Sequence, residues 1–303
     1  RLIDPRHWRF LLEVGNFLRR ARRDLGNLVE MSLDDYLASR NVPADVRDRF
    51  VVPLAAALWS LAPERCGAFP AETYFRFLDQ HGMLRVTRPL AWQTVVGGSR
   101  RYVDALVDRL RVRGMTLRLA TPVDTVVRDA TGVTIVAGGH DHRFDRIILA
   151  THADTALAVL ASPSDAERDT LASFRYSTNR TILHRDRRFL PHRPAAHASW
   201  NYVADPDTAR VAVTYSMTRL QGLPDAPYLV TLNPRVTPAG AIHEVEFAHP
   251  QFDRAALAAQ SALAWIGRDR RTYYAGSYAG FGFHEDAMRS GIAAAARALT
   301  GAP

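Results

Sequence analysis

The sequence has 303 residues, of which 47% are hydrophobic and 23% charged, so it belongs with globular proteins and not with disordered ones. All 39 basic side chains are arginines, and the formal net charge of +8 is spread along the chain, whereas nucleic-acid-binding proteins usually cluster it. The single cysteine, Cys66, excludes an intrachain disulfide and a cysteine-based metal site, and we predict no bound metal.

The location of the protein follows only in part from these properties. No run approaches the roughly 18 apolar residues of a membrane span, so we expect a cytoplasmic protein. The arginine-rich stretch 19–23 leaves peripheral contact with a membrane open, although a solvated helix face explains it more simply. The oligomeric state stays unknown. Because the first residue is Arg1 and not methionine, we expect the sequence to begin inside a longer reading frame.

The opening third of the chain predicts helices. Asp4 followed by Pro5 is typical of a helix start, and apolar residues recur at helical spacing until Gly26. A capping-box pattern beginning at Ser32 predicts a second, short helix. A third helix is expected over 46–60, bent or broken at its proline.

The middle of the chain changes from a helical to a strand period. Ser99 is expected to cap an amphipathic helix that Gly114 ends. Short β-rich runs, separated by turn residues, then predict strands at 116–119, 123–127, 133–137 and 143–150. Further strands are expected at 211–217, 229–232, 242–247 and 272–275, and a last helix at 285–299.

The segment 272–296 combines a short apolar strand, three spaced glycines and a helix start that carries two acids. The first N–H groups of a helix have no partner inside the helix, and its positive end stabilises negative charge by roughly 0.3–1 kcal/mol. The segment therefore suits the binding of an anionic group. The simpler alternative is that the glycines only make a turn and that Glu285 and Asp286 cap the helix.

The string GFHEDAMRSG over 282–291 resembles the C-terminal flavin-binding signature of the flavin-containing amine oxidases. The resemblance implies FAD as cofactor. It implies that the residues nearest the flavin in this segment are Gly276, Ser277, Gly282, Phe283, His284 and Glu285. Ser277 departs from the family, which usually has an acid at that position.

Two earlier segments resemble the same family. Gly97 and Gly98, followed by a helix, resemble the pair of glycines that leads back into the FAD domain, and DRIILAT, which ends at Ala150 and Thr151, resembles a strand that passes near the dinucleotide. The counterpart of Val123 contacts adenine through its backbone. Taken singly, these features are common in loops and cores, and their shared order strengthens the resemblance.

A closer resemblance covers most of the chain. The strings ATHAD, LHRD, SWNY, TLNP and GFHED, spread over 150–286, resemble a bacterial subfamily of NAD/FAD-binding amine oxidoreductases. Members of that subfamily tend to be encoded near methyltransferases that resemble cyclopropane-fatty-acid synthases. By that association, the substrate is expected to be a small or lipid-like molecule, with an acyl chain as the favoured class.

Two features are missing from the sequence. The family's GxGxxG fingerprint would occupy a β-α-β unit of about 30 residues before Arg1, so we expect these 303 residues alone to bind FAD poorly. The lysine that many amine oxidases place near flavin N5 is also absent. We therefore predict an FAD-dependent oxidoreductase of the dehydrogenase or desaturase type. The alternatives are a flavin-dependent isomerase or mutase and a truncated, non-catalytic fragment.

His284 is the candidate catalytic side chain, because the resemblance places its turn beside the flavin ring. Other polar and aromatic side chains are weaker candidates, with sheet packing, a surface pair or a helix cap as the simpler interpretations: His152, His184, Asp186, Trp200, Asn201, Tyr202 and Tyr215.

The expected fold is α/β, with a partial FAD-binding Rossmann-like domain and a substrate domain that combines an antiparallel or mixed sheet with helices. The expected segments are a helical part of the substrate domain at 1–95, an FAD-domain segment at 96–155, the substrate-domain sheet at 156–253, and the C-terminal FAD-domain strand, loop and helix at 254–303.

Overall fold

The computed structural model describes residues 4–28, 30–59, 61, 63–87, 91, 93–204, 211–223 and 226–300. The chain forms two compact units, and each is built from two separate stretches of sequence. The first contains residues 1–115 and 177–249, and the second contains residues 116–176 and 250–303. The strands β5 (Arg175–His184) and β9 (His243–Gln251) carry the chain between the two units.

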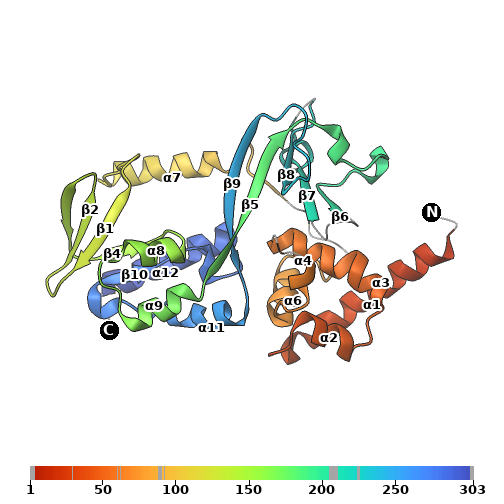
Figure 1. Ribbon diagram of the computed structural model, residues 1–303, viewed down its shortest axis with the longest axis horizontal. Helices are drawn as coiled ribbons and strands as arrows, with labels where there is room; N and C mark the ends of the chain where they lie inside the picture. Colours follow the sequence, from red (N-terminus) through yellow and green to blue (C-terminus); the bar gives the residue numbers. More distant parts are fainter. Residues whose placement is uncertain are drawn as a thin grey trace. The chain divides into compact units, whose positions relative to one another are not determined.

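The first unit begins with helices, as the sequence predicts (Figure 1). The side chain of Asp4 caps α1, and the predicted capping box of Ser32 is present at the start of α2. The expected third helix contains a π-helical turn that ends just before its proline; its last residue, Ser60, lies outside the described residues. The helical elements are α1 (Pro5–Asp24), η1 (Leu25–Asn27), α2 (Leu33–Ser39), α3 (Ala44–Val46), η2 (Arg47–Val51), α4 (Val52–Trp59), α5 (Pro63–Cys66), α6 (Ala71–Gln80) and α7 (Arg100–Val112).

A five-stranded sheet, in the order β6-β7-β8-β5-β9, completes the first unit. The pairs β6–β7, β7–β8 and β5–β8 are antiparallel, which confirms the expected antiparallel sheet. The remaining elements here are β6 (Trp200–Ala204), β7 (Val211–Ser216), β8 (Leu229–Leu232), α10 (Met217–Gln221), η3 (Arg187–Phe189) and η4 (Pro194–Ala196).

The second unit holds a three-stranded antiparallel meander and a parallel pair of strands. The parallel strands β4 and β10 are far apart in sequence, and both are followed by helices. Buried apolar side chains from β1, α8, α9 and α11 share one core with Tyr274 of β10. The elements are β1 (Val123–Arg128), β2 (Val133–Ala137), β3 (His140–Phe144), β4 (Ile147–Leu149), α8 (Ala153–Val159), α9 (Asp165–Ala172), α11 (Arg254–Ala262), η5 (Arg268–Arg270), β10 (Thr272–Tyr274), η6 (Ser277–Ala279) and α12 (His284–Thr300).

Three local predictions are wrong. Residues 116–119 form no strand, although their composition favours one. The expected strand at 143–150 is divided at Asp145 and Arg146, because its first part pairs with β2 and its second part pairs with β10. Ser99 stands at the N-cap position of α7, but its backbone is already helical and its side chain makes no capping bond.

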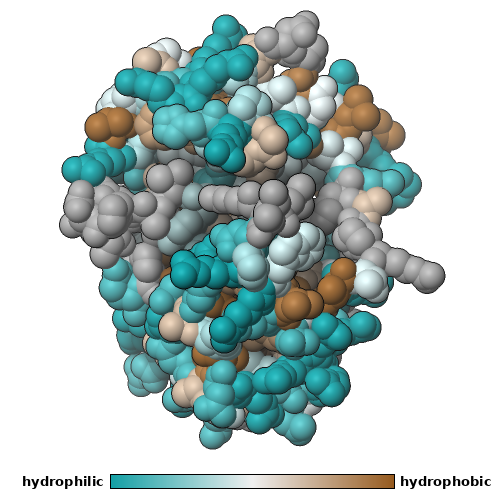
Figure 2. Space-filling view, turned by 90° about the vertical axis from the view of Figure 1, so that its right-hand side faces the viewer, coloured by the Kyte–Doolittle hydropathy of each residue, from teal (hydrophilic) through white to brown (hydrophobic). Residues whose placement is uncertain are grey.

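Hydrophilic side chains cover most of the face shown in Figure 2, and hydrophobic side chains appear there in small groups. The described helices include none that is both long and apolar enough to span a membrane. In the described stretches, His, Cys, Asp and Glu form no group of three or more that could hold a metal ion.

Candidate functional site

The candidate site lies where the parallel strands β4 and β10 end. Tyr274 pairs with Leu149, and the N–H of Ala275 donates to the carbonyl of Leu149 at 3.0 Å, so the two chains leave the sheet together. Ala150 and Thr151 follow the first strand, and Gly276 follows the second. In open α/β sheets, ligands bind at the carboxyl ends of parallel strands. The pairing thus unites two segments that are more than 120 residues apart in sequence.

The loop after β10 is shaped by its glycines. A Cβ on Gly276 would lie 2.4 Å from the ring of Tyr278, which is buried against the glycine. A Cβ on Gly280 would meet the Asp286 carboxylate, also at 2.4 Å. Gly282 has a φ of +95°, and a Cβ placed on it would lie 3.0 Å from the ring of Phe252. At these three positions a side chain would either clash or strain the backbone, so glycine keeps the loop close to its support.

Three side chains hold this loop through its backbone. Ser290, on α12, accepts a hydrogen bond from the N–H of Gly276 at 2.9 Å, and its hydroxyl lies within donating distance of two carbonyls. Gln260, on α11, donates to the carbonyls of Tyr278 and Gly280 at 3.0 and 2.7 Å. The carboxylate of Asp286 accepts from the N–H of Phe283 at 3.0 Å. The loop is therefore fixed from both neighbouring helices by short, directional bonds.

The start of α8 forms the other side of this edge. The ring of His152 stacks on the ring of Tyr176, with centroids 4.4 Å apart, and the Tyr176 hydroxyl accepts from the N–H of Ala153 at 2.9 Å. His152 occupies the N-cap position without a side-chain capping bond, so the cap interpretation of this residue is wrong. Burial raises the pKa of Tyr176 to about 12, so its hydroxyl stays protonated.

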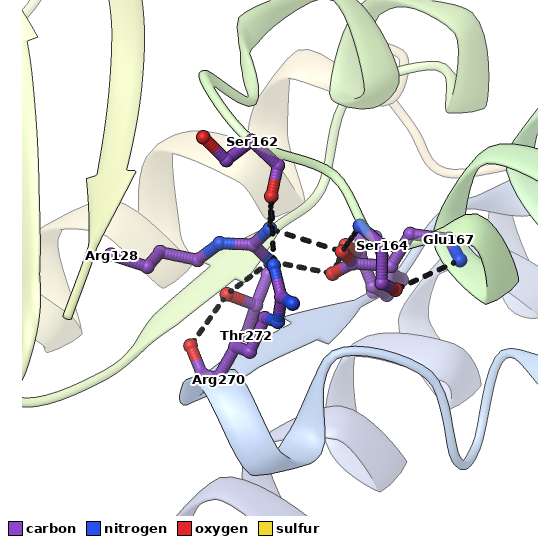
Figure 3. Close-up of polar contacts among 7 residues, drawn as sticks. Arg128, Ser162, Ser164, Glu167, Arg270 and Thr272 are labelled. Atoms are coloured by element: carbon purple, nitrogen blue, oxygen red, sulfur yellow. Dashed lines mark hydrogen bonds and ion pairs between the residues drawn. The ribbon is translucent and has the colours of Figure 1, made fainter. Parts of the chain in front are cut away.

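The opposite, amino end of β10 is held by a buried ion pair (Figure 3). Arg128 donates from Nη1 to Oε1 of Glu167 at 2.5 Å and from Nη2 to Oε2 at 3.0 Å, and it also reaches the carbonyl of Ser162 and the hydroxyl of Thr272. The Tyr274 hydroxyl donates to Oε1 of Glu167 at 2.6 Å. Burial favours the neutral acid, but the bonds from Arg128 and Tyr274 outweigh it and lower the pKa of Glu167 to about 2.

The second unit brings most of the predicted cofactor residues together at one edge. Ala150, Thr151, His284 and Glu285 are exposed there, and the loop glycines are half-buried. His284 is the first residue of α12, so its side chain stands at the helix N-terminus. Val123 begins β1 in the same unit and is 40% exposed.

Gly97 and Gly98 belong to the first unit. Their φ angles, +83° and +79°, are in the left-handed region, where glycine is favoured over other residues. The N–H of Gly98 donates to the carbonyl of Val95 at 2.9 Å, so the pair makes a tight turn that leads into α7.

The remaining histidine candidate lies in the five-stranded sheet. His184 is fully buried; its Nε2 lies 2.7 Å from the Thr231 hydroxyl, and its Nδ1 accepts from the N–H of Asp186 at 3.1 Å. Burial lowers the pKa of His184, although the charge of Asp186 opposes the shift, so the ring is neutral. The hydroxyl of Thr231 also forms a hydrogen bond with the hydroxyl of Thr214. The side-chain amide of Asn201 donates to the carbonyl of Thr214. These side chains form a buried polar network, and the surface-pair interpretation of His184 and Asp186 is wrong.

The aromatic candidates of the same sheet lie on its other face. Trp200 and Tyr215 make an edge-to-face contact with ring centroids 5.8 Å apart, and the Tyr215 hydroxyl donates to the carbonyl of Ala57 at 3.2 Å. Burial raises the pKa of both Tyr202 and Tyr215 to about 12. These contacts agree with the packing interpretation, because Ala57 belongs to helix α4, which lies against this sheet.

The sequence alone does not indicate the contacts of Gln260 and Tyr278 or the role of Ser290. Ser290 lies inside the signature string. Its hydrogen bond with Gly276, 14 residues away, becomes evident only in the folded structure. Gln260 lies 18–20 residues from the carbonyls that it bonds, and nothing local marks it.

With this geometry described, comparisons place the chain among known proteins. A family model described as flavin containing amine oxidoreductase matches residues 2–231. No curated protein matches the sequence.

Several solved structures have a similar fold. A CLA-producing fatty acid isomerase from P. acnes shares 16% identity over 89% of this chain and 66% of that one, with a TM-score of 0.62. A putative protoporphyrinogen oxidase from Exiguobacterium sp. 255-15 shares 12% identity over 90% and 68%, with a TM-score of 0.63. An engineered putrescine oxidase shares 14% identity over 99% and 77%, with a TM-score of 0.69. The chain spans about two thirds of the isomerase, and the likenesses confirm the predicted mixed α/β fold of FAD-dependent oxidoreductases.

Proposed function

Because the chain belongs to the family of flavin-containing amine oxidoreductases, we propose that it is an FAD-dependent oxidoreductase that transfers hydride from a small or lipid-like substrate to the flavin. The observation that carries this proposal is the glycine loop at the carboxyl ends of β4 and β10. When bound, the flavin supplies the electron-accepting ring, and the protein supplies binding, orientation and exclusion of water.

The residues of this edge fit such a cofactor. The three glycines let the loop pack closely on Tyr278, Asp286 and Phe252, and the 17-residue helix α12 directs its positive N-terminus to the same edge. The residues that would hold the flavin are the loop from Gly276 to Glu285 together with Ala150 and Thr151. In this arrangement, Ser290 and Gln260 act on the cofactor only by fixing the loop backbone.

The decisive experiment is flavin binding by the complete reading frame that encodes this chain. We expect a yellow protein with one FAD per chain, and a Gly276→Ala variant, in which the new methyl group meets Tyr278, should lose most of it. A control Gly26→Ala, at an exposed position outside the edge where a Cβ meets nothing within 4 Å, should retain FAD. A complete protein that is folded but binds no flavin would contradict the proposal.

His284 is proposed as the side chain that tunes the flavin. The supporting observation is its exposed position at the first turn of α12, beside the glycine loop. In the complete protein, His284→Ala should change the flavin reduction potential or the turnover rate, while FAD content stays constant. Unchanged potential and turnover would remove His284 from the mechanism.

The substrate class is the part of the proposal that rests most on the relatives. The sequence has no lysine, so the water that a lysine holds near flavin N5 in many amine oxidases has no counterpart among these residues, which favours dehydrogenation. Hydride transfer needs mainly a C–H bond held about 3–3.5 Å from N5. The similar fold of a fatty acid isomerase keeps isomerisation as the second candidate. Anaerobic turnover without an added electron acceptor would select isomerisation over net oxidation.

A further inference from the structure

Two arginines of the second unit differ from their neighbours. Among the described residues, the Nε atoms of Arg268 and Arg297 are buried and have no hydrogen-bond partner. A buried N–H without an acceptor loses its hydration and gains nothing in return, and a charged group loses more than a neutral one. The burial of these two Nε atoms without an acceptor therefore requires an explanation.

Both arginines lie towards the start of β10, because α12 follows β10 and packs back along it. Arg268 opens η5, immediately before β10, and Arg297 stands in the last turn of α12, which packs on β10 through Ala294. Burial lowers the pKa of Arg297, and the positive charge of Arg268 lowers it further, whereas nearby Tyr273 raises it. The charge of Arg268 thus acts unfavourably on that of Arg297, and both side chains are half-buried.

Neighbouring arginines at this end of β10 find oxygen acceptors within the protein. Arg270 donates to the carbonyl of Ser162 at 3.0 Å, and Arg271 donates to the carbonyl of Ala130 at 3.2 Å. Arg128 has the carboxylate of Glu167. These three arginines therefore have oxygen acceptors, whereas the buried Nε atoms of Arg268 and Arg297 have none among the described residues.

We propose that Arg268 and Arg297 bind a phosphoryl group. Two guanidinium groups offer several N–H donors, and a tetrahedral, multiply charged oxyanion can accept from both at once and neutralise their repulsion. The guanidinium of Arg268 lies over the ring of Trp265, at 4.9 Å from its centroid, which holds it in place. Trp265 is itself 68% exposed, so the site opens to solvent beside an aromatic surface.

This site is separate from the candidate flavin edge. Arg268 precedes the first residue of β10, whereas the glycine loop follows the last, and Arg297 lies at the C-terminal end of α12 while His284 begins it. The phosphoryl group therefore belongs to a second ligand, and the proposal holds whether or not the flavin proposal does. The group could be free phosphate or the headgroup of an anionic lipid, because both present the same oxygens.

The test uses inorganic phosphate as probe. The chain is titrated with sodium phosphate by isothermal calorimetry at pH 7, with sodium chloride of equal ionic strength in the cell. We expect saturable binding by the wild type, and a dissociation constant raised about tenfold or more by Arg297→Gln or Arg268→Gln, since each removes charge-assisted bonds. Arg168→Gln removes the same charge from an exposed pair on α9 and should bind like the wild type.

The source of the phosphoryl group is decided with vesicles. Co-sedimentation with phosphatidic acid vesicles but not phosphatidylcholine vesicles, lost in Arg297→Gln, would identify a lipid headgroup. Phosphate binding without co-sedimentation would identify a soluble ligand. The proposal is overturned if the wild type binds neither probe, or if the two glutamine variants bind as well as Arg168→Gln while circular dichroism shows all of them folded.

Discussion

The two ends of strand β10 are held by opposite means. Before the strand, Arg128 forms an almost fully buried ion pair with Glu167 and donates to the hydroxyl of the strand's first residue, Thr272. After the strand, the neutral hydroxyl of Ser290 holds Gly276 through its backbone. The first end is fixed by charges that satisfy one another, and the turn that directly follows the strand is fixed by the neutral side chains of Ser290 and Gln260.

This difference matches what each end must do. A desolvated ion pair is rigid but sensitive to loss of either partner, because the remaining charge stays buried. The carboxyl end must accept a cofactor, and neutral side chains such as Ser290 and Gln260 can hold the loop without competing for that ligand. The four predictions that follow test this contrast, beginning with the change of largest expected effect.

The largest effect is expected from Glu167→Gln. The variant removes the negative charge that faces Arg128 and leaves the guanidinium buried with neutral acceptors. Breaking a buried pair in this way costs about 3–5 kcal/mol, so the free energy of unfolding should fall by roughly that amount in urea titrations.

An exposed pair provides the control for this variant. Glu244→Gln makes the same chemical change in the solvated pair with Arg180 and should alter stability little. If Glu167→Gln prevents folding, Tyr274→Phe removes one bond to the same carboxylate and should cost about 1 kcal/mol. Equal stabilities for Glu167→Gln and the wild type would show that the charge does not hold β10.

Acid should reproduce part of this loss in the wild type. The pKa of Glu167 is lowered to about 2 in the folded protein from an ordinary 4.5, so the stabilisation is complete above pH 4.5 and disappears as the pH falls towards 2. The contribution is roughly 3–4 kcal/mol, because the pKa falls from 4.5 to about 2 and each pH unit corresponds to about 1.4 kcal/mol. Thermal unfolding from pH 5 to pH 2 should show this slope, and Glu167→Gln should flatten it. Parallel slopes for both proteins would contradict the assignment.

Local signals explain which parts of the fold the sequence predicts. Asp4 and Ser32 start helices through their own caps, and the short apolar run of β8 forms a strand at the expected residues. The run at 143–150 fails because nothing in its composition shows that the chain changes sheets at Asp145. The ten-residue strand β5 is missed because its polar residues hide the alternation, and its partners β8 and β9 follow much later in the chain.

The candidate site, like the fold, is only partly predictable from local sequence signals. The glycines and the helix start of 276–285 are contiguous, so their signature is visible in the sequence. The contacts of Gln260 with the loop, and the approach of Arg268 to Arg297, depend on how α11, β10 and α12 pack. The spacing of these residues in the sequence does not predict their contacts, because a helical pattern does not determine which side chains of distant segments meet.

A smaller effect is expected from Ser290→Ala. The N–H of Gly276 loses its acceptor, which should cost about 1–2 kcal/mol of stability. If the loop holds FAD as proposed, the complete protein should also release FAD more readily, measured as recovery of flavin fluorescence on dilution. Ser261→Ala removes a comparable bond to a helix carbonyl on exposed α11 and should change neither value. A stability loss with unchanged FAD release would limit Ser290 to the fold.

The smallest effect is expected from Arg297→Gln in phosphate-free buffer. Unlike Arg128, Arg297 has no acid to lose, and its charge is repelled by Arg268, so the melting temperature in sodium chloride should stay constant or rise slightly. Phosphate should then raise the melting temperature of the wild type and leave that of the variant unchanged, because a ligand that binds only the folded state stabilises it. A variant that melts well below the wild type in chloride would mean that Arg297, like Arg128, has its partner within the protein. In that case Arg297 would have a structural role like that of Arg128, and no phosphoryl group would be needed to explain it.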